Sequence, residues 1–196
     1  DGGEGTGDVL KLSAGKHTFG DNDKLKNIEK IETNASGSEV ILTAQKEALE
    51  ITGGDGVDKI TGGEGDDIII GGKGDDIITG GDGVDKITGG EGADTIKGGK
   101  GNDEITVAAA GKADSDTMDG EDGTADVLKL SAGKHTFGDD AKLKNIEKIE
   151  TATAGSEVIL SAQTEALEIT GSDGVDKITG GEGADTIKGG KGNDEI

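Results

Sequence analysis

The sequence predicts an all-β fold, a parallel β-roll or β-solenoid, and three observations lead to this prediction. Residues 53–106 divide without a gap into six nonapeptides, each with Gly at positions one, two and four, Asp at position six and Ile at position eight. Residues 1–78 match residues 119–196 at 62 of 78 positions, so the whole chain repeats with a period of 118 residues. The formal net charge is −22, two residues are aromatic, and Cys and Pro are absent. Such a chain cannot build a large globular core, but a thin stack of repeats remains possible.

Each position of the nonapeptide has a physical role. A short strand at positions seven to nine points the Ile inward and its two neighbours outward. The glycines allow a tight turn with φ > 0, and the carbonyls of that turn can face a hard cation, which prefers oxygen ligands. We therefore predict metal ligands at the position-six carboxylates and at the carbonyls of positions two and four. The carboxylates are those of Asp58, Asp67, Asp76, Asp85, Asp94 and Asp103, and of Asp176, Asp185 and Asp194 in the second copy; the carbonyls are those of Gly54, Gly56, Gly63, Gly65, Gly72, Gly74, Gly81, Gly83, Gly90, Gly92, Gly99 and Gly101.

The G-G-x-G-x-D-x-U-x pattern of these nonapeptides resembles the RTX family of secreted bacterial proteins, also called hemolysin-type calcium-binding repeats. The resemblance implies that the metal is calcium, with several ions bound. It implies two nonapeptides per coil, so that each repeat stacks on the next but one. The Asp pairs 58–76, 67–85, 76–94 and 85–103 would then each hold one ion. The resemblance also implies an extracellular or cell-surface location reached by type I secretion.

Five segments follow one another without a linker composition. Residues 1–52 are read as metal-free solenoid coils with a degenerate first repeat, in which Asp8 takes position six and Leu10 position eight. Residues 53–106 are the calcium β-roll, 107–129 degenerate repeats, 130–170 the second metal-free coils and 171–196 a second calcium β-roll. Asp126 is the second-copy equivalent of Asp8 and is a further possible ligand. Ser172 replaces a position-two glycine, which is expected to strain that turn.

The metal-free segment carries several patterns of its own. Residues 13–20 are expected to form a loop that exposes His17, and His135 is its equivalent. Residues 21–32 resemble an EF-hand loop in spacing, but Leu25 and Lys26 stand where a ligand and a glycine are required, which argues against calcium there. Leu25, Ile28 and Ile31 recur every three residues, as in a wider metal-free solenoid or a leucine-rich repeat, with a short helix as the alternative. Residues 38–42 and 48–52 are expected to be strands.

After Thr106 the pattern weakens. Asp116 and Met118 fit positions six and eight of a degenerate nonapeptide that starts at Gly111. The cluster of Asp114, Asp116, Asp119 and Asp122 either holds another ion or is simply solvated.

No catalytic motif is visible, so we expect a protein that is not an enzyme. The negative charge argues against nucleic acid and anionic membranes as partners, and no apolar run is long enough to span a membrane. One remaining class is a structural module of a surface layer, adhesin stalk or filament; the other is the accessory calcium domain of a secreted toxin or enzyme. The long tandem repeat favours the first, as a segment of a longer repetitive protein. An ice-binding role would need an outward Thr array, and position nine interrupts that array with Ile70 and Lys97.

Outward isoleucines mark a possible contact. Ile68 and Ile70 occupy positions seven and nine of the second nonapeptide, and Ile77 occupies position seven of the third. Three outward isoleucines on a strongly charged rod suggest a cover. We expect Ile68 and Ile70 to pack against another chain, including a copy of this one, or against a neighbouring loop. Because the second copy has Thr186 and Lys188 at the same places, drift between repeats is the alternative.

Overall fold

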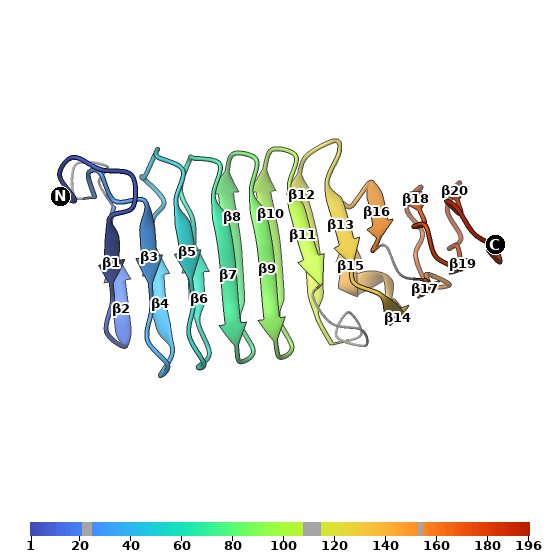
Figure 1. The fold of residues 1–196 in the computed structure, drawn as a ribbon, viewed down its shortest axis with the longest axis horizontal. Helices are drawn as coiled ribbons and strands as arrows, with labels where there is room; N and C mark the ends of the chain where they lie inside the picture. The colour runs from blue at the N-terminus through green and yellow to red at the C-terminus, as the bar shows by residue number, and fades with distance from the viewer. Residues whose placement is uncertain (21–24, 108–114, 153–154) are drawn as a thin grey trace.

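The computed structural model describes residues 1–20, 25–107, 115–152 and 155–196. In these residues the chain forms a β-solenoid, and every strand pairs with its neighbours in parallel. Figure 1 shows the rungs succeeding one another along the long axis, with the N-terminus at one end and the C-terminus at the other. The predicted fold class is confirmed.

Three sheets form the walls of the solenoid. The ten-stranded sheet contains, in spatial order, β1 (Val9–Lys11), β3 (Lys30–Glu32), β5 (Glu50–Thr52), β7 (Ile68–Lys73), β9 (Lys86–Glu91), β11 (Glu104–Val107), β13 (Val127–Leu130), β16 (Lys148–Thr151), β18 (Glu168–Thr170) and β20 (Thr186–Lys188). The seven-stranded sheet contains β15 (Leu143–Lys144), β12 (Thr117–Asp122), β10 (Thr95–Lys100), β8 (Ile77–Asp82), β6 (Lys59–Thr61), β4 (Ser38–Ile41) and β2 (Gly15–Thr18). The three-stranded sheet contains β14 (Gly133–Thr136), β17 (Ser156–Ile159) and β19 (Lys177–Thr179), and a 3-10 helix, η1, spans Asp140–Lys142.

The register confirms that each nonapeptide stacks on the next but one. Ile69 lies opposite Ile87 in the ten-stranded sheet, and Ile78 lies opposite Ile96 in the seven-stranded sheet. The position-eight isoleucines of residues 53–106 therefore point inward from both sheets and form the core, at 0–1 % exposure. Strands β7 to β10 are longer than predicted, because they continue through the first three residues of the following nonapeptide.

The coils predicted to be metal-free continue the same stack. Leu10 pairs with Ile31, and Ile31 with Ile51, so the degenerate first repeat and the coil after it are in register with the nonapeptides. The predicted strands at 38–42 and 48–52 are present as β4 and β5, each slightly shorter. The alternative of a short helix at Leu25, Ile28 and Ile31 is wrong, because residues 25–29 form no helix and Ile31 lies in β3. In the second copy, η1 precedes the equivalent Leu143. Asp21 and Asp23 of the rejected EF-hand reading lie outside the described residues.

The prediction that both histidines lie in loops is wrong, and the prediction of exposure is wrong for His135, whereas His17 is partly exposed. His17 and His135 lie in β2 and β14, opposite Val40 and Val158. Their side chains alternate inward with outward Lys neighbours, and His135 is completely buried. The imidazole Nε2 of each is 2.8 Å from a main-chain oxygen four residues earlier, that of Ser13 and that of Ser131. The Gly-Lys-His-Thr stretch reads as a loop by composition, but the stacking partner decides its conformation.

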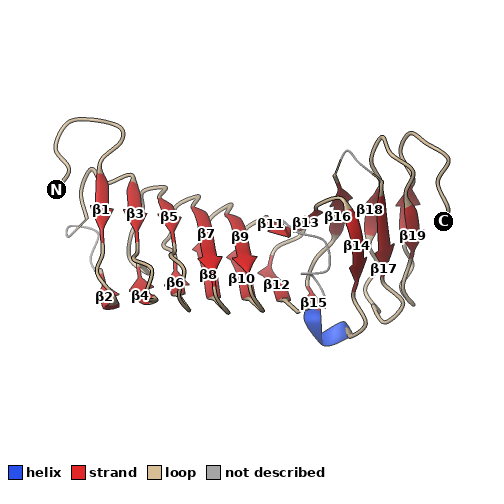
Figure 2. Cartoon of the chain, turned by 60° about the horizontal axis from the view of Figure 1, so that its bottom comes forward, coloured by secondary structure: helices blue, strands red, loops and turns tan. Residues whose placement is uncertain are grey.

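The stack changes its pairing at the start of the second copy. Met118 of β12 pairs with Leu143 of β15, so β14 does not extend the seven-stranded sheet and instead begins the three-stranded one. Figure 2 shows η1 and β15 at the place where the stack changes direction.

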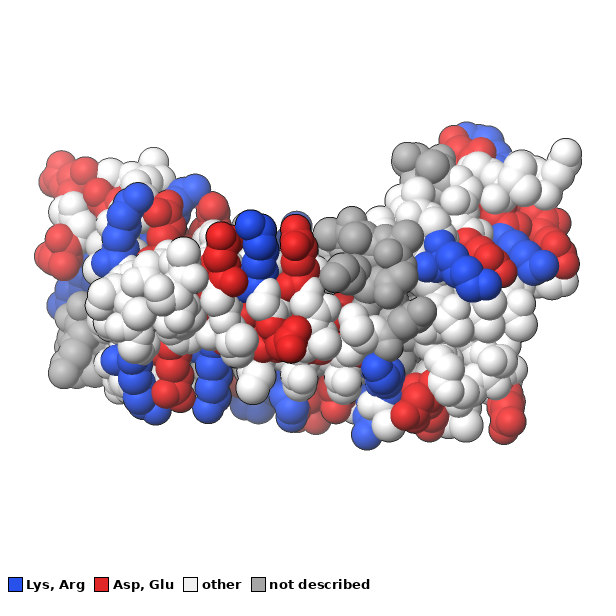
Figure 3. Space-filling view, turned by 90° about the horizontal axis from the view of Figure 1, so that it is seen from below, with Lys and Arg blue, Asp and Glu red and all other residues white. Residues whose placement is uncertain are grey.

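The outer surface carries columns of alternating charge (Figure 3). Lys30 pairs with Glu50 at 2.7 Å, and Lys100 pairs with Asp82 at 2.8 Å, each from one coil to the next. Such exposed pairs contribute roughly 0–1 kcal/mol each, so they favour the register without carrying the stability of the fold. None of the described residues forms a helix long and apolar enough to cross a membrane.

Candidate metal centre

The position-six aspartates are buried inside the edges of the solenoid. Each one precedes an inward Ile by two residues, so its side chain also points into the coil. Exposure is 0–1 % for Asp58, Asp67, Asp76, Asp85, Asp94, Asp103 and Asp176, while Asp185 and Asp194, close to the C-terminus, are partly exposed. Burying this many ionisable groups is costly unless each one is paired, protonated or bound to a cation.

One oxygen of each aspartate belongs to a hydrogen-bond ladder along the stack. Asp58 N donates to Oδ1 of Asp76 at 2.8 Å, and Asp76 N donates to Oδ1 of Asp94 at 2.9 Å. On the other edge Asp67 N donates to Oδ1 of Asp85, and Asp85 N to Oδ1 of Asp103, both at 2.8 Å. The two predicted columns of aspartates are therefore present, and each carboxylate reaches back to the preceding coil.

The second carboxylate oxygen distinguishes two kinds of turn. In the turns that end at Asp58, Asp67, Asp176 and Asp185, here called closed turns, the position-two N–H donates to Oδ2 of the turn's own aspartate at 2.8–3.0 Å. No glycine of these turns has a positive φ. Ser172 fits this conformation, because both its N–H and its Oγ lie within 3.0 Å of Asp176 Oδ2. The predicted strain at Ser172 is therefore wrong.

The remaining turns adopt a different backbone. In the turns that end at Asp76, Asp85, Asp94, Asp103 and Asp194, here called open turns, the glycines at positions two and four have φ between +97° and +141°. The position-two N–H therefore points away from the carboxylate. Oδ2 of Asp76, Asp85 and Asp103 is buried and has no hydrogen-bond partner among the described residues. An open turn thus presents a buried carboxylate oxygen without a donor, which is a position for a cation.

A main-chain carbonyl of the next coil faces that oxygen. A Cβ atom placed on Gly80 would lie 2.3 Å from Oδ2 of Asp85 and 2.4 Å from the carbonyl oxygen of Gly98. Both oxygens therefore border the same small space beside Gly80. The arrangement recurs at Gly71, where the corresponding distances to Asp76 Oδ2 and to the Gly89 oxygen are both 2.5 Å. Only glycine leaves this space free, and oxygens of this kind are the ligands that calcium prefers.

Burial and mutual repulsion make these carboxyls difficult to ionise. Burial raises the pKa of Asp76 to about 7, and the negative charges of Asp94 and Asp58 add to the effect. Burial likewise raises the pKa of Asp85 to about 7, with Asp67 and Asp103 as its charged neighbours. In both cases a hydrogen bond from one N–H of the preceding coil lowers the pKa, but by less than burial raises it. A proton and a cation therefore compete to neutralise the same oxygens.

The carbonyls predicted as ligands, at positions two and four, are not the carbonyls that face the aspartate Oδ2 atoms. Carbonyls at positions two and four point along the stack to the glycines of the following coil: Gly54 O lies 2.2 Å from the Cβ position of Gly72, and Gly56 O lies 2.7 Å from that of Gly74. Gly54 O accepts from Lys73 N at 2.9 Å. The oxygens that face Oδ2 come from position one, and sequence reasoning missed them, because the period fixes which turns stack but not the direction of each carbonyl.

The described members of the acidic cluster after Thr106, Asp116, Asp119 and Asp122, do not converge on one site. Asp116 takes position six as predicted, since its Oδ1 accepts from Asp94 N at 3.0 Å. Asp119 lies outward on β12 and accepts from Asn145 Nδ2 at 2.6 Å, and Asp122 is exposed. Asp114 and Gly111 lie outside the described residues.

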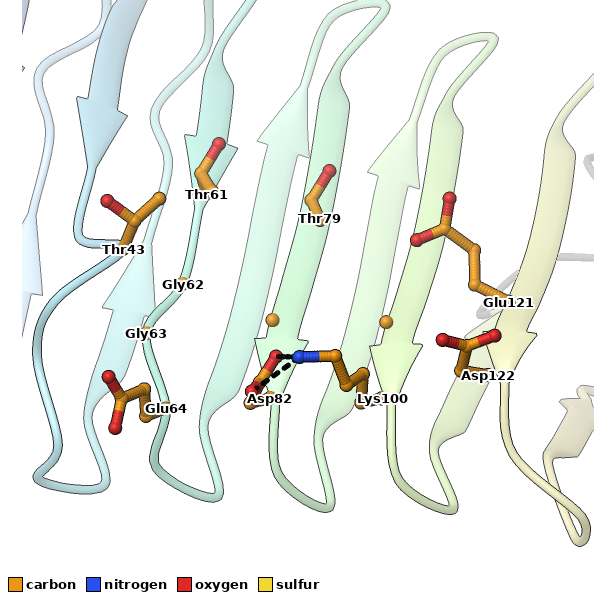
Figure 4. Close-up of a pocket in the computed structure, with 12 residues that line it drawn as sticks. Thr43, Thr61, Gly62, Gly63, Glu64, Thr79, Asp82, Lys100, Glu121 and Asp122 are labelled. Carbon is orange, nitrogen blue, oxygen red and sulfur yellow. Dashed lines mark hydrogen bonds and ion pairs between the residues drawn. The ribbon is translucent and has the colours of Figure 1, made fainter.

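A shallow groove runs across the outer side of the turns of one edge, but it contains none of the position-six carboxylates. Thr61 and Thr79 line one part of it, and Glu64, Asp82 and Lys100 line another. In Figure 4 these side chains stand on neighbouring rungs, with Asp82 and Lys100 paired across the gap between two of them. The groove is thus part of the exposed charge columns, and the candidate metal positions lie inside the turns behind it.

Across the part of the chain that the structure describes, no three His, Cys, Asp or Glu side chains converge on one point. A metal held here would therefore take most of its ligands from the main chain.

Comparison with known proteins agrees with this geometry. The RTX calcium-binding nonapeptide repeat matches four copies, over residues 52–87, 79–110 and 169–196. A comparison with curated proteins gave no match. The matched residues carry the closed and open turns together with the inward isoleucines. The two nonapeptide blocks of the chain, residues 52–110 and 169–196, are therefore RTX calcium-binding nonapeptide repeats.

Proposed function

We propose that the chain is a calcium-stiffened structural module of a secreted bacterial surface protein, such as a surface layer, an adhesin stalk or an extracellular filament, and that it is not an enzyme. The observation that carries the proposal is the set of open turns that end at Asp76, Asp85 and Asp103, each with a buried Asp oxygen that faces a carbonyl of the next coil. An ion held between two coils joins them, and a column of such ions joins the stack into a rod. The repetition of the whole 118-residue unit supports this role, because a rod is lengthened by adding units.

The ligands proposed for these ions are the position-six aspartates of the open turns and the carbonyls around them. Asp76, Asp85, Asp94 and Asp103 form the central group, and the carbonyls of the turn glycines complete the coordination. Calcium supplies the positive charge that the buried carboxylates lack, and its binding adds directly to the free energy of unfolding because the unfolded chain has no such site.

The second candidate function is the accessory calcium domain of a type I-secreted toxin or enzyme. The same family match supports it, since the repeat itself is common to both uses. The number of 118-residue units in the parent chain separates the two: many units favour the rod, and a single block beside a catalytic domain favours the accessory role.

A pair of aspartate variants tests the calcium clamp. Asp76→Ala is expected to lose more bound calcium than Asp58→Ala. Asp76 Oδ2 has no donor, whereas Asp58 satisfies its carboxylate with the N–H groups of Gly54 and Ser38 at 2.8 and 2.7 Å. Calorimetric titration with calcium gives the number of ions for each variant, and circular dichroism in saturating calcium verifies that both are folded. Equal losses of calcium would contradict the distinction between open and closed turns.

We propose that copies of the chain associate through the outward side chains of Ile68 and Ile70, and substitution of these residues tests the proposal. They are 47 % and 38 % exposed, so no described segment of the chain covers them, and Ile77 is 46 % exposed on the opposite sheet. The double variant Ile68→Thr with Ile70→Lys, which copies the second unit, is expected to abolish concentration-dependent association in calcium. Ile77→Glu, the second-unit residue on the other face, is the matched control and is expected to associate as before. Sedimentation velocity measures both; unchanged association of the double variant would leave drift between repeats as the explanation.

A further inference from the structure

The irregular turn at residues 120–126 lies outside the residues that the RTX repeat matches, yet it shares with the open turns a positive φ at position two and a buried position-six carboxylate oxygen without a donor. Glu121 occupies position two with φ +64°, an unusual backbone for a residue other than glycine. Its side chain lies on the surface and pairs with Lys97. Asp126, at position six, is completely buried, and its Oδ2 has no hydrogen-bond partner among the described residues.

The ladder of carboxylates continues through this turn and ends on a glutamate. Asp103 N donates to Oδ1 of Asp126 at 2.7 Å, as in the regular columns. Asp126 N then donates to Oε2 of Glu147 at 2.8 Å. Glu147 thus occupies the place that the next position-six Asp would take, although it belongs to a coil without nonapeptides. The longer glutamate side chain allows the ladder to reach from a turn of different length.

The next coil also supplies the facing carbonyl. A Cβ atom placed on Gly120 would lie 2.0 Å from the carbonyl oxygen of Asn145 and 2.6 Å from Oδ2 of Asp126. Asn145 therefore stands where the regular stack has a position-one glycine. It has φ +50°, a region that asparagine tolerates better than most residues. Gly123 borders the same carboxylate on another side. A Cβ atom placed on Gly123 would lie 2.4 Å from the carbonyl oxygen of Gly101 and 2.3 Å from Oδ2 of Asp126.

The first copy shows the same arrangement at its own irregular turn. Asp8 N donates to Oε2 of Glu29 at 2.8 Å, and Gly3 and Asn27 have φ +95° and +52°. The carbonyl oxygen of Asn27 again crowds the first glycine of the turn, Gly2. Oδ2 of Asp8 is buried without a partner among the described residues. The arrangement thus occurs both in the middle of the stack, behind Asp103, and in its first coils.

We propose that each irregular turn is a further divalent-cation site, at Asp126 and at Asp8, completed from the following coil by the carboxylate of Glu147 or Glu29 and by the main-chain carbonyl of Asn145 or Asn27. The proposal rests on the proposed calcium-binding function. It extends that function into the coils that the sequence reads as metal-free.

Capping of the main chain by Glu147 does not explain the site by itself. A cap accounts for the bond to Asp126 N, but it brings a second carboxylate to the main chain of Asp126, whose own Oδ2 is already buried without a donor. The lysine that follows Glu147, Lys148, pairs with Glu150 and not with this site. A cation between the two carboxylates neutralises both and satisfies the carbonyls that face them.

Calcium stoichiometry of glutamine variants tests the proposal. Glu147→Gln keeps the shape and an acceptor for Asp126 N but removes the charge, so it is expected to bind one ion fewer than the natural chain. The double variant Glu29→Gln with Glu147→Gln is expected to bind two fewer. Glu157→Gln, which removes an exposed carboxylate paired with Lys134, is the matched control and is expected to bind as many ions as the natural chain.

The outcomes separate this inference from the proposed function. If the natural chain binds calcium and Glu147→Gln binds the same number of ions with the same affinity, the irregular turns are not sites, while the nonapeptide sites stand. If the natural chain binds no calcium, both proposals fail. Should Glu147→Gln not fold, the amide resonances of residues 120–126 in the natural chain decide: they are expected to shift with calcium, and resonances that stay in place would overturn the site.

Discussion

Removal of calcium at pH 7.5 is expected to unfold most of the chain, with loss of the greater part of the β-sheet circular dichroism signal. Without a cation the columns of Asp76, Asp85 and Asp103 place carboxylates one coil apart inside the protein. Neighbouring strands lie roughly 4.8 Å apart, and two unit charges about 5 Å apart repel by about 3 kcal/mol at an effective dielectric of 20. Several such contacts exceed what a domain of ordinary stability can tolerate.

The apolar core cannot compensate for this repulsion. Each nonapeptide coil contributes one inward Ile side chain from each sheet, such as Ile69 and Ile78. The closed turns that end at Asp58 and Asp67 satisfy their own carboxylates, and so they depend less on the ion. We therefore expect residual structure after chelation to be concentrated in the coils around these turns, with β3 to β6, and the open turns to be lost first.

Circular dichroism and amide hydrogen exchange, with chelator and after calcium is restored, measure this effect. Magnesium at the same concentration is the control, since it keeps its water and prefers a smaller octahedral site; it is expected not to restore the signal. A chelated chain that retains its full β signal at pH 7.5 would show that calcium does not organise the fold.

The fold could be predicted from the sequence because the period of nine fixes both the strand and its stacking partner. Ile at every eighth position of nine requires one inward side chain per strand, and two nonapeptides per coil bring Ile69 against Ile87. The coils outside the nonapeptide blocks were harder to predict, because Gly-Lys-His-Thr resembles a loop in composition. Its strand conformation depends on pairing with residues 38–41, about twenty positions later. No local sequence pattern predicts a strand partner at that separation.

The positions of the aspartates along the two edges could be predicted from the sequence, but the conformations of their turns could not. Nonapeptides of the same pattern form closed turns at Asp58 and open turns at Asp85, because the coil stacked in front of each differs: Gln45, Glu47 and their neighbours lie in front of the second closed turn, whereas other nonapeptides lie in front of the open ones. Glu147 was missed for a related reason. It replaces an aspartate of the ladder from a segment that has no glycine turn, and only its bond to Asp126 reveals its place.

Acidification is expected to restore β structure to the calcium-free chain, so that the chelated protein is more folded at pH 5 than at pH 8. In the fold without calcium, Asp76 and Asp85 have pKa values of about 7, raised mainly by burial, against an ordinary value of 3.8. Protons therefore neutralise the same oxygens that calcium neutralises at higher pH.

The sign of the pH dependence of stability follows from the number of protons bound by the folded and the unfolded chain. Between about pH 4 and pH 7 the folded chain holds protons on Asp76 and Asp85 that the unfolded chain has released. The free energy of unfolding therefore falls as the pH rises through this window, by about 1.4 kcal/mol per pH unit for each carboxyl. This contribution is fully present below the unfolded pKa and is lost as the pH passes the folded pKa.

Salt bridges act in the opposite direction on Glu39 and Glu168, whose pKa values lie below 4.5 because of Lys16 and Lys188. Their contribution is lost only in stronger acid, so the calcium-free chain is expected to be most stable near pH 5.

Circular dichroism of the chelated chain between pH 4.5 and pH 8 gives the folded fraction, and urea unfolding gives the free energy of unfolding at each pH at which the chain is still folded. The double variant Asp76→Asn with Asp85→Asn is the matched control, because neutral amides of the same shape remove the two titrating carboxyls. Its free energy of unfolding is expected to vary less steeply with pH and to exceed that of the natural chain at pH 8 without calcium. The same comparison in saturating calcium is expected to reverse the order, since the natural chain then holds ions that the variant lacks. A chelated natural chain that gains stability from pH 5 to pH 8 would show that the buried carboxyls do not govern the fold in the absence of the metal.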